Sequence, residues 1–392
     1  MPSRTLRVVI APDSFGGALD SVGVAAAIAR GWSRARPEDK LIHAPMADGG
    51  EGTLAALVDA MGDRVERRTA RVHDPLGREV MAEWLLLDEG RTAFVEMAAA
   101  SGLALLTSAE RTPANARAAS TRGTGELLRL ALDAGADGIT IGLGGSATTD
   151  GGAGLLAALG LRLLDADGHD LPDGGGSLER LVRADPRDLD PRLRDARLTI
   201  ACDVTNPLTG ERGAAATYAR QKGADPPTVN DLDRALGRWG EAIESATGRQ
   251  VADLAGAGAA GGTTAGLLGF TSAAIRPGVE VVAEMVGLSD RLAEADLVIT
   301  GEGRADEQTL SGKAALGVAR LAPKGTPVVL LCGALGPGVG TLEASGAFAL
   351  VQPIPDHPMD LAEAMADSQR LLENAAERVA RSVGIGLLLS DG

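Results

Sequence analysis

Apolar runs that alternate with helix-like segments dominate both ends of this chain. Runs of this kind, bounded by Gly, Pro or Asp turns, are typical of parallel strands whose two faces are covered by helices. The predicted strands lie at residues 6–11, 41–44, 296–300, 327–333 and 347–351. The predicted helices lie at residues 21–34, 53–61 and 361–382. The alternation predicts an α/β fold with a Rossmann-like, doubly wound parallel sheet built from both chain ends.

The middle of the chain has a less regular pattern. Residues 83–87 and 93–97 predict a β pair, and residues 138–143 and 198–202 predict further strands. This mixed pattern favours a second α/β domain rather than a continuation of the first sheet.

The length of the chain predicts two domains, since 392 residues are many for one hydrophobic core. We expect a Rossmann-like domain made from residues 1–72 and 280–392. The second α/β domain, residues 73–279, would be inserted in it, with a cleft between the two.

The charge of the chain excludes several classes of partner. Lys and Arg total 38 whereas Asp and Glu total 53, so the formal net charge is −15 and we expect no nucleic-acid and no membrane partner. The N-terminal residues lack a signal-peptide core, and no apolar run approaches the ~20 residues of a membrane helix, so we expect a cytoplasmic protein. Cys202 and Cys332 lie in apolar runs and predict small buried side chains.

A glycine-rich segment, residues 301–313, follows a predicted strand and leads into a helix-like run. Gly301 and Gly303 would let the backbone approach a ligand, the helix N-terminus offers unpaired N–H groups, and Lys313 adds a positive charge. These features predict a turn that binds phosphate. The alternative is a solvated lysine near a helix start.

Two more glycine-rich loops follow the first two predicted strands, and each carries acids. Asp13 and Ser14 would face the ligand crevice at the carboxyl ends of a parallel sheet, or would form a turn that starts the helix. Asp48 precedes Gly49 and Gly50, and this loop has little stiffening without a ligand. Asp48 could act as a general base or a metal ligand, or could cap the next helix.

Two further clusters lie in the middle of the chain. Ser146 and Thr148 offer hydroxyl and backbone N–H groups that suit a carboxylate or a phosphate. Asp203 ends a predicted strand and Lys222 follows it, so the two could hold Mg²⁺ and a phosphoryl group. The alternative for the second pair is a turn and a surface charge.

Two patterns carry no functional weight. Residues 256–261 match the dinucleotide pattern G-x-G-x-x-G, but no strand precedes them, so close packing of small residues is the better explanation. The four histidines are scattered singly, without metal-ligand spacing.

Together the loops resemble those of the class I glycerate kinases, which phosphorylate D-glycerate with ATP to give 2-phosphoglycerate. The stretches that carry the resemblance are residues 11–15, 47–53, 144–148, 150–152, 203–208, 221–224 and 301–313. Each motif alone is weak, whereas their order and number are specific. The family architecture, a Rossmann-like lobe with a second lobe inserted, agrees with the pattern above.

The resemblance implies a role for each loop, with ATP and Mg²⁺ as cofactors. It assigns Asp203 and Asp306 to the metal, Lys222 and Lys313 to phosphate charge, and Asp48 to the hydroxyl proton of the substrate. The implied catalytic residues are Asp48, Asp203, Lys222 and Lys313. The implied substrate-binding residues are Asp13, Ser14, Gly49, Gly50, Ser146 and Thr148. The implied nucleotide-binding residues are Gly301, Gly303, Asp306 and Lys313.

Two positions depart from the family pattern. The family usually has lysine and then glycine after Phe15, whereas this chain has Gly16 and Gly17. The missing cation leaves open a kinase of another small hydroxy acid, and a non-catalytic hydroxy-acid-binding protein is a further alternative. Thr149 stands where the family often has Asn. We expect a monomer or a homodimer.

Overall fold

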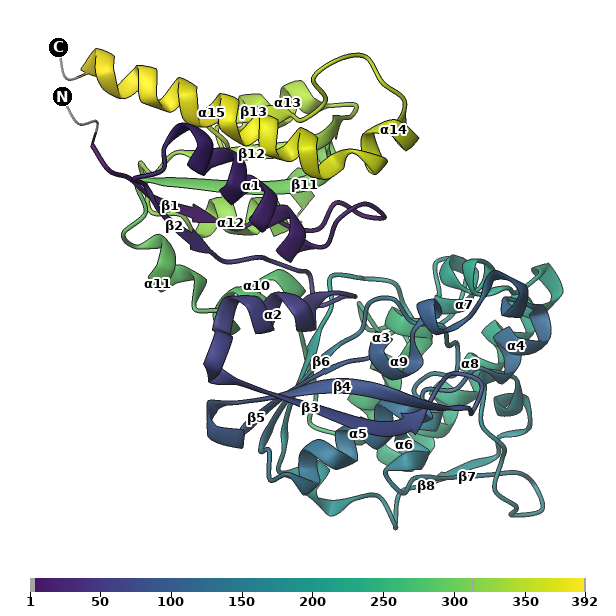
Figure 1. The fold of residues 1–392 in the computed structure, drawn as a ribbon. Coiled ribbons are helices and arrows are strands. Elements are labelled where there is room, and N and C mark those ends of the chain that lie inside the picture. The colour runs from purple at the N-terminus through teal and green to yellow at the C-terminus, as the bar shows by residue number, and fades with distance from the viewer. Residues whose placement is uncertain (1–3, 312–313, 391–392) are drawn as a thin grey trace. The chain divides into compact units, whose positions relative to one another are not determined.

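The structure, a computed structural model, describes residues 4–311 and 314–390, and the chain divides into two compact units. The terminal unit comprises Met1–Asp48, Ala55–Gly62 and Val279–Gly392. The inserted unit comprises Gly49–Leu54 and Asp63–Gly278. Each unit has its own sheet (Figure 1).

The terminal unit contains a five-stranded sheet in which all pairs are parallel. Its strands in spatial order are β13 (Leu350–Pro353), β12 (Val328–Leu335), β11 (Leu297–Ala305), β1 (Arg7–Ile10) and β2 (Lys40–His43). Its helices are α1 (Ser21–Ala35), α2 (Thr53–Met61, which begins in the inserted unit), α10 (Gly278–Met285), α11 (Leu288–Leu292), α12 (Ala314–Leu321), α13 (Val339–Ala344), α14 (Leu361–Ala366) and α15 (Ser368–Ser390). The predicted parallel sheet from both chain ends is therefore confirmed.

Helices α1 and α15 lie side by side against the sheet of the terminal unit (Figure 1). A side chain at Gly31 of α1 would place its Cβ 2.0 Å from the carbonyl oxygen of Glu373 in α15, so the two backbones approach closely there. The Glu373 carboxylate accepts hydrogen bonds from Arg30 and Arg34 of α1. Trp32 and Leu372 are fully buried in the same core. The two chain ends are thus packed into one unit.

The inserted unit contains a six-stranded mixed sheet. Its strands in spatial order are β10 (Ala274–Arg276), β9 (Arg197–Ala201), β6 (Gly138–Gly142), β5 (Thr92–Glu96), β4 (Glu79–Leu87) and β3 (Val65–His73). The first four are parallel and the last three are antiparallel, with β5 common to both sets. The predicted β pair is confirmed as β4 and β5.

Helices and one separate hairpin complete the inserted unit. The helices are α3 (Ala98–Ser101), α4 (Pro113–Ala118), α5 (Arg122–Asp133), α6 (Ala153–Ala158), α7 (Ala214–Tyr218), α8 (Pro226–Thr247) and α9 (Ala259–Phe270). The hairpin pairs β7 (Arg162–Leu164) with β8 (Arg183–Asp185). The buried Trp239 of α8 donates from Nε1 to the carbonyl oxygen of Gly151 at 2.8 Å and stacks on Phe270. This contact ties α8 and α9 to the glycine-rich loop before α6.

Candidate active site

The first group of predicted site residues lies beyond the carboxyl end of β1 in the terminal unit. The backbone N–H of Asp13 donates to the carbonyl oxygen of Gly301 in β11 at 2.9 Å. The N–H of Ser14 donates to Oδ1 of Asp13 at 2.6 Å. These bonds fix Asp13 at the edge of the sheet where the carboxyl ends of parallel strands meet.

The electrostatics of Asp13 are unusual. Burial raises the pKa of this carboxyl to about 7, the negative charges of Asp48 and Glu302 add to the rise, and the hydrogen bond from Ser14 opposes it. A carboxyl group with such a pKa can exchange a proton near neutral pH. Asp13, Asp48 and Glu302 therefore form a group of interacting acids, which we call the acid group.

Strand β11 corrects one expectation about the glycine-rich segment. The strand does not end at residue 300 but continues to Ala305, so Gly301 and Gly303 lie in it rather than in a turn. Gly301 pairs with Leu331 of β12, and a Cβ at Gly301 would lie 3.2 Å from the Leu331 carbonyl oxygen. The glycine thus permits close packing within the sheet. Lys313 lies outside the described residues.

Two buried acids belong to this segment, Glu302 in β11 and Asp306 directly after it. Glu302 accepts a hydrogen bond from the hydroxyl of Thr309 at 2.6 Å, and that hydroxyl accepts one from the N–H of Asp306 at 3.2 Å. Asp306 also accepts from the N–H of Gln308 at 2.9 Å and lies 3.3 Å from the guanidinium of Arg304. The sequence pattern did not single out Glu302 as a site residue, although Glu302 stands in the same segment as Asp306.

The second group of predicted residues belongs to the inserted unit, where two glycine-rich loops touch through their backbones. A Cβ at Gly142 would lie 2.4 Å from the carbonyl oxygen of Gly49, and a Cβ at Gly144 would lie 2.3 Å from the Cα of Gly50. Gly49 itself has a φ of 83°, which favours glycine. Only residues without side chains allow these loops to approach so closely.

Lys222 is buried in the inserted unit and holds the second of these loops. Its Nζ donates to Oγ of Ser146 at 3.0 Å and to the carbonyl oxygen of Thr148 at 2.6 Å. Burial lowers the pKa of Lys222 to about 7, and the charge of Asp150 opposes this shift. The alternative that Lys222 is a surface charge is therefore wrong, because its ammonium group is buried among other protein groups.

Asp150 is fully buried next to this lysine and organises the following turn. Its carboxylate accepts hydrogen bonds from the N–H and the hydroxyl of Thr121, both at 2.8 Å, and from the N–H groups of Gly152 and Gly154, both at 3.2 Å. Burial raises its pKa, and these four bonds oppose the rise. The hydroxyl oxygen of Thr148 is buried without a partner among the described residues.

The G-x-G-x-x-G match packs against the same loop. A Cβ at Gly261 would lie 2.0 Å from the carbonyl oxygen of Thr148, and Gly261 has a φ of 68°. No strand precedes this segment among the described residues, since α9 follows a turn. Close packing of small residues, the preferred explanation from sequence, is confirmed.

Asp203 lies beyond the end of β9 and is exposed. Its Oδ1 accepts a hydrogen bond from the N–H of Gly278, the first residue of α10, at 3.1 Å. Asp203 belongs to the inserted unit whereas Asp306 belongs to the terminal unit. The two carboxylates predicted to hold a metal are therefore placed in separate units.

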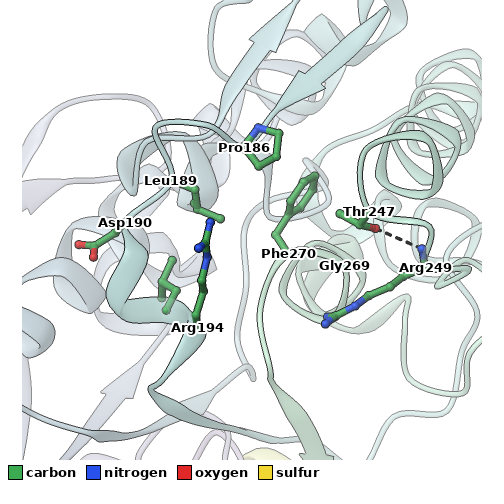
Figure 2. A pocket seen from close by; sticks show the side chains of 9 residues that line it. Pro186, Leu189, Asp190, Arg194, Thr247, Arg249, Gly269 and Phe270 are labelled. Atoms are coloured by element: carbon green, nitrogen blue, oxygen red, sulfur yellow. Dashed lines mark hydrogen bonds between the residues drawn. The ribbon is translucent and has the colours of Figure 1, made fainter.

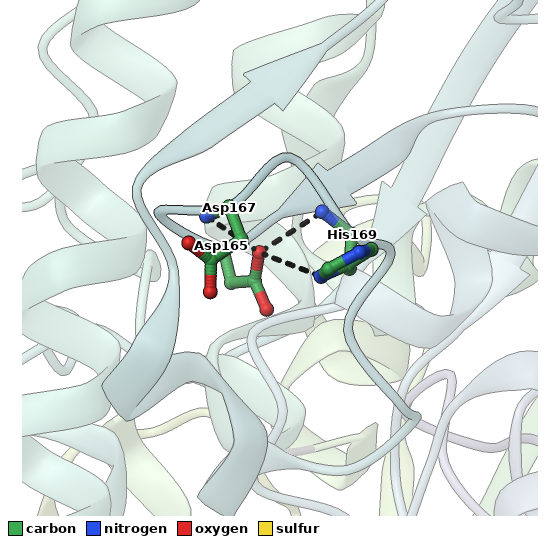
Figure 3. A group of neighbouring side chains, drawn as sticks. All are labelled: Asp165, Asp167 and His169. Carbon is green, nitrogen blue, oxygen red and sulfur yellow. Dashed lines mark hydrogen bonds and ion pairs between the residues drawn. The ribbon is translucent and has the colours of Figure 1, made fainter.

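The described residues offer two other features that could suggest a site. A cavity of about 220 Å³ in the inserted unit is lined by Arg194, Arg249 and Phe270 among others, and none of the predicted site residues lines it (Figure 2). Asp165, Asp167 and His169 form a possible metal-binding group in the β7–β8 hairpin (Figure 3). Oδ1 of Asp165 accepts from the N–H groups of the other two, which explains this group as a turn.

No helix in the described parts of the chain has both the length and the apolar character needed to cross a membrane. The buried Cys332 has a pKa raised by burial to about 12, in keeping with the prediction of a small buried side chain.

Comparison with known proteins gives a consistent result over nearly the whole chain. Residues 8–384 match the model of the glycerate kinase family. The chain is 45% identical to the glycerate kinase of Halalkalibacterium halodurans over 95% of this chain and 97% of that protein. It is 42% identical to the glycerate 2-kinase of Escherichia coli K12, with coverage of 97% and 99%. A crystal structure from Salmonella typhimurium LT2, assigned as glycerate kinase 2, superposes with a TM-score of 0.84 at 42% identity and covers 98% of this chain and 99% of that one. The chain therefore belongs to the glycerate kinase family and is a kinase.

Proposed function

We propose that this protein transfers the γ-phosphoryl group of ATP to the O2 hydroxyl of D-glycerate, giving 2-phosphoglycerate and ADP. The observation that carries the proposal is the acid group of the terminal unit, in which burial and two neighbouring carboxylates raise the pKa of Asp13 to about 7. A hydroxyl nucleophile needs a nearby group that accepts its proton, and a group of interacting carboxylates can supply one. The E. coli relative named glycerate 2-kinase supports attack from O2.

We assign the proton to the acid group. Asp48 accepts the proton of the substrate hydroxyl while the hydroxyl oxygen forms a bond to the γ-phosphorus. The bond between that phosphorus and the β-γ bridging oxygen breaks, and ADP leaves. Asp13 lies close enough to Asp48 for the charge of Asp48 to act on it. Ser14 orients Asp13 through its backbone N–H.

Asp306 and Asp203 are the proposed Mg²⁺ ligands. Their carboxylate oxygens are the ligand type that Mg²⁺ prefers, and each is already oriented by a backbone N–H, that of Gln308 or that of Gly278. When bound, Mg²⁺ would neutralise negative charge on the phosphate groups. The carboxylate donors of both residues support this proposal.

The remaining predicted residues would position the anionic groups. We propose that Gly49, Gly50, Ser146 and Thr148 bind substrate, and that Gly301, Gly303 and Lys313 bind nucleotide. The Lys222 ammonium donates to Ser146 and to Thr148, which belong to the same loop. We therefore propose that Lys222 adds positive charge to the phosphate site from beneath this loop.

Product analysis tests the proposal. The protein is incubated with D-glycerate, ATP and Mg²⁺, and ³¹P NMR distinguishes a 2-phosphate from a 3-phosphate by its coupling pattern. We expect 2-phosphoglycerate with D-glycerate and far less product with L-glycerate. Exclusive 3-phosphoglycerate would overturn the assignment to O2, and intact ATP would overturn the kinase reaction with this acceptor.

A different hydroxy acid as acceptor is the second candidate, because Gly16 stands where the family usually has lysine. A Cβ at Gly16 would meet no atom within 4 Å, so the structure leaves room for a side chain there. We expect the Gly16→Lys variant to lower KM for D-glycerate if the family lysine binds the substrate carboxylate. A higher turnover of the unmodified protein on tartronate than on D-glycerate would favour the second candidate.

A further inference from the structure

Glu96 is a buried acid that no sequence pattern marked as part of the site. It is the last residue of β5 and only 7% of its surface is exposed. Its two carboxylate oxygens have separate partners: Oε1 accepts from the N–H of Gly52 at 3.0 Å, and Oε2 accepts from the N–H of Leu54 at 2.9 Å. The side chain therefore binds the segment Gly49–Leu54, which follows Asp48 in the chain.

These two N–H groups lie at the start of α2, where backbone donors lack partners within the helix. The first turn of α2 contains no acidic residue, so the helix supplies no negative charge of its own there. Glu96 provides both the acceptor atoms and the charge from another strand. The hydroxyl of Thr53 completes the turn by donating to the carbonyl oxygen of Gly50 at 2.7 Å.

The position of Glu96 in the sheet explains why it reaches this segment. Glu96 pairs with Gly142 of β6, and Gly142 is the residue whose missing side chain leaves room for the carbonyl oxygen of Gly49. The ends of two neighbouring strands thus position the segment. Glu96 binds it through hydrogen bonds, and Gly142 lets its backbone pack closely because it has no side chain. The segment itself is rich in glycine, so it has little conformational preference without these contacts.

We infer that Glu96 is a positioning residue for phosphoryl transfer, which fixes the backbone of Gly49–Leu54 in the conformation that the reaction uses. This inference rests on the proposed function, because Gly49 and Gly50 are its proposed substrate-binding residues and Asp48 is its proposed proton acceptor. Glu96 touches no reacting atom in this account. It acts through the two N–H groups that it holds.

The experiment compares Glu96→Gln with Glu79→Gln in the whole chain. Gln at residue 96 keeps one acceptor oxygen but turns an amide NH₂ toward the second N–H donor. Glu79 lies on the adjacent strand β4, and its exposed carboxylate pairs with Arg71, so Glu79→Gln is a matched control. Hydrogen exchange is measured in peptides that cover residues 49–54, together with kcat and KM for D-glycerate and the melting temperature.

We expect Glu96→Gln to speed exchange at Gly52 and Leu54 and to lower kcat by about 10- to 100-fold, because a small misplacement of a reacting group has effects of this size. Exchange in peptides that cover residues 121–155 should stay unchanged, and Glu79→Gln should match the unmodified protein throughout. Glu96→Asp keeps the charge on a shorter side chain, and we expect its kcat to lie between those of the Gln variant and the unmodified protein.

Two results would overturn the inference. Unchanged kcat in Glu96→Gln would show that the reaction does not depend on this anchor. Faster exchange across the whole inserted unit, with a large fall in melting temperature in both Glu96 variants, would show a role in general stability instead. An unmodified protein that is inactive with D-glycerate would refute the proposed function, and local exchange at Gly52 would then decide by itself whether Glu96 anchors the segment.

Discussion

The two units both bury acids near their glycine-rich loops, but they treat the charge of those acids differently. In the terminal unit, the charges of Asp48 and Glu302 add to the rise in the pKa of Asp13, and hydrogen bonds from the backbone and the side chain of Ser14 oppose it. In the inserted unit, Asp150 accepts four hydrogen bonds. Glu96 accepts one from a backbone N–H at each carboxylate oxygen, although the charges of Glu51 and Glu83 also add to the rise in its pKa. Burial raises the pKa of all three groups.

The comparison separates two uses of a buried carboxyl group. An acid surrounded by other acids gains by binding a proton or a cation, so its environment favours chemistry. An acid surrounded by N–H donors is satisfied as a carboxylate and fixes the backbone that supplies those donors. The acid group should therefore affect turnover, whereas Asp150 and Glu96 should affect the shape of the loops.

The largest effect should come from Asp48→Asn, which removes the proposed proton acceptor. We expect kcat to fall by about 10²- to 10⁴-fold, the range typical of a general base, with KM for ATP changed by less than about threefold. Steady-state kinetics with D-glycerate and ATP measure both constants. Asp59→Asn, an exposed acid on α2, is the control and should keep full activity. Equal turnover in Asp48→Asn would remove Asp48 from this role.

Asp150→Asn should have the next largest effect, and it should act on stability. The Asn side chain would turn an NH₂ group toward donors that now bond to a carboxylate oxygen. Because these groups are buried, we expect a loss of about 2–4 kcal/mol in the free energy of unfolding. Urea unfolding followed by circular dichroism measures the loss. A change below about 0.5 kcal/mol would mean that Asp150 does not organise the loop.

Gly144→Ala should have a moderate effect, because its Cβ would lie 2.3 Å from the Cα of Gly50. One loop must move, so we expect a loss of about 1–3 kcal/mol in stability and a kcat lowered by about tenfold. Gly138→Ala in β6 is the matched control, since the nearest atoms to its Cβ would be 3.6 Å away. If both variants behave alike, the close approach of the loops is not what requires glycine.

Local patterns predicted the sheets and most of the loops because strands, turns and helices each leave a signal within a few residues. The acids of residues 11–15 and 47–53 were found because they stand directly after apolar strands. Strand β3 was missed since its side chains are mostly exposed and it is held by pairing with β4 at the sheet edge. The continuation of β11 past residue 300 depends likewise on β12, which is distant in sequence.

The burial and the hydrogen-bond partners of charged side chains could not be predicted from local patterns. Lys222 is a loop lysine in sequence, and its burial depends on acceptors at Ser146 and Thr148, more than 70 residues away. Glu96 ends an apolar strand, as many surface acids do, and only the fold brings Gly52 and Leu54 to it. An acid at the end of a buried strand is a local signal that would have indicated Glu96, whereas Glu302 lies inside β11.

The smallest effect tests the electrostatics of the acid group through stability. The pKa of Asp13 rises from 3.8 to about 7 on folding, so ionisation of this carboxyl costs more in the folded state than in the unfolded state. The unmodified protein should therefore lose stability as the pH rises from ~4 to ~7. Asp13→Asn cannot ionise, and above pH ~7 we expect it to be more stable than the unmodified protein by about 1–2 kcal/mol. Urea unfolding at pH 5 and pH 8 measures this difference, which should be larger at pH 8. Equal differences at the two pH values would contradict the raised pKa and would remove the contrast between the acids of the two units.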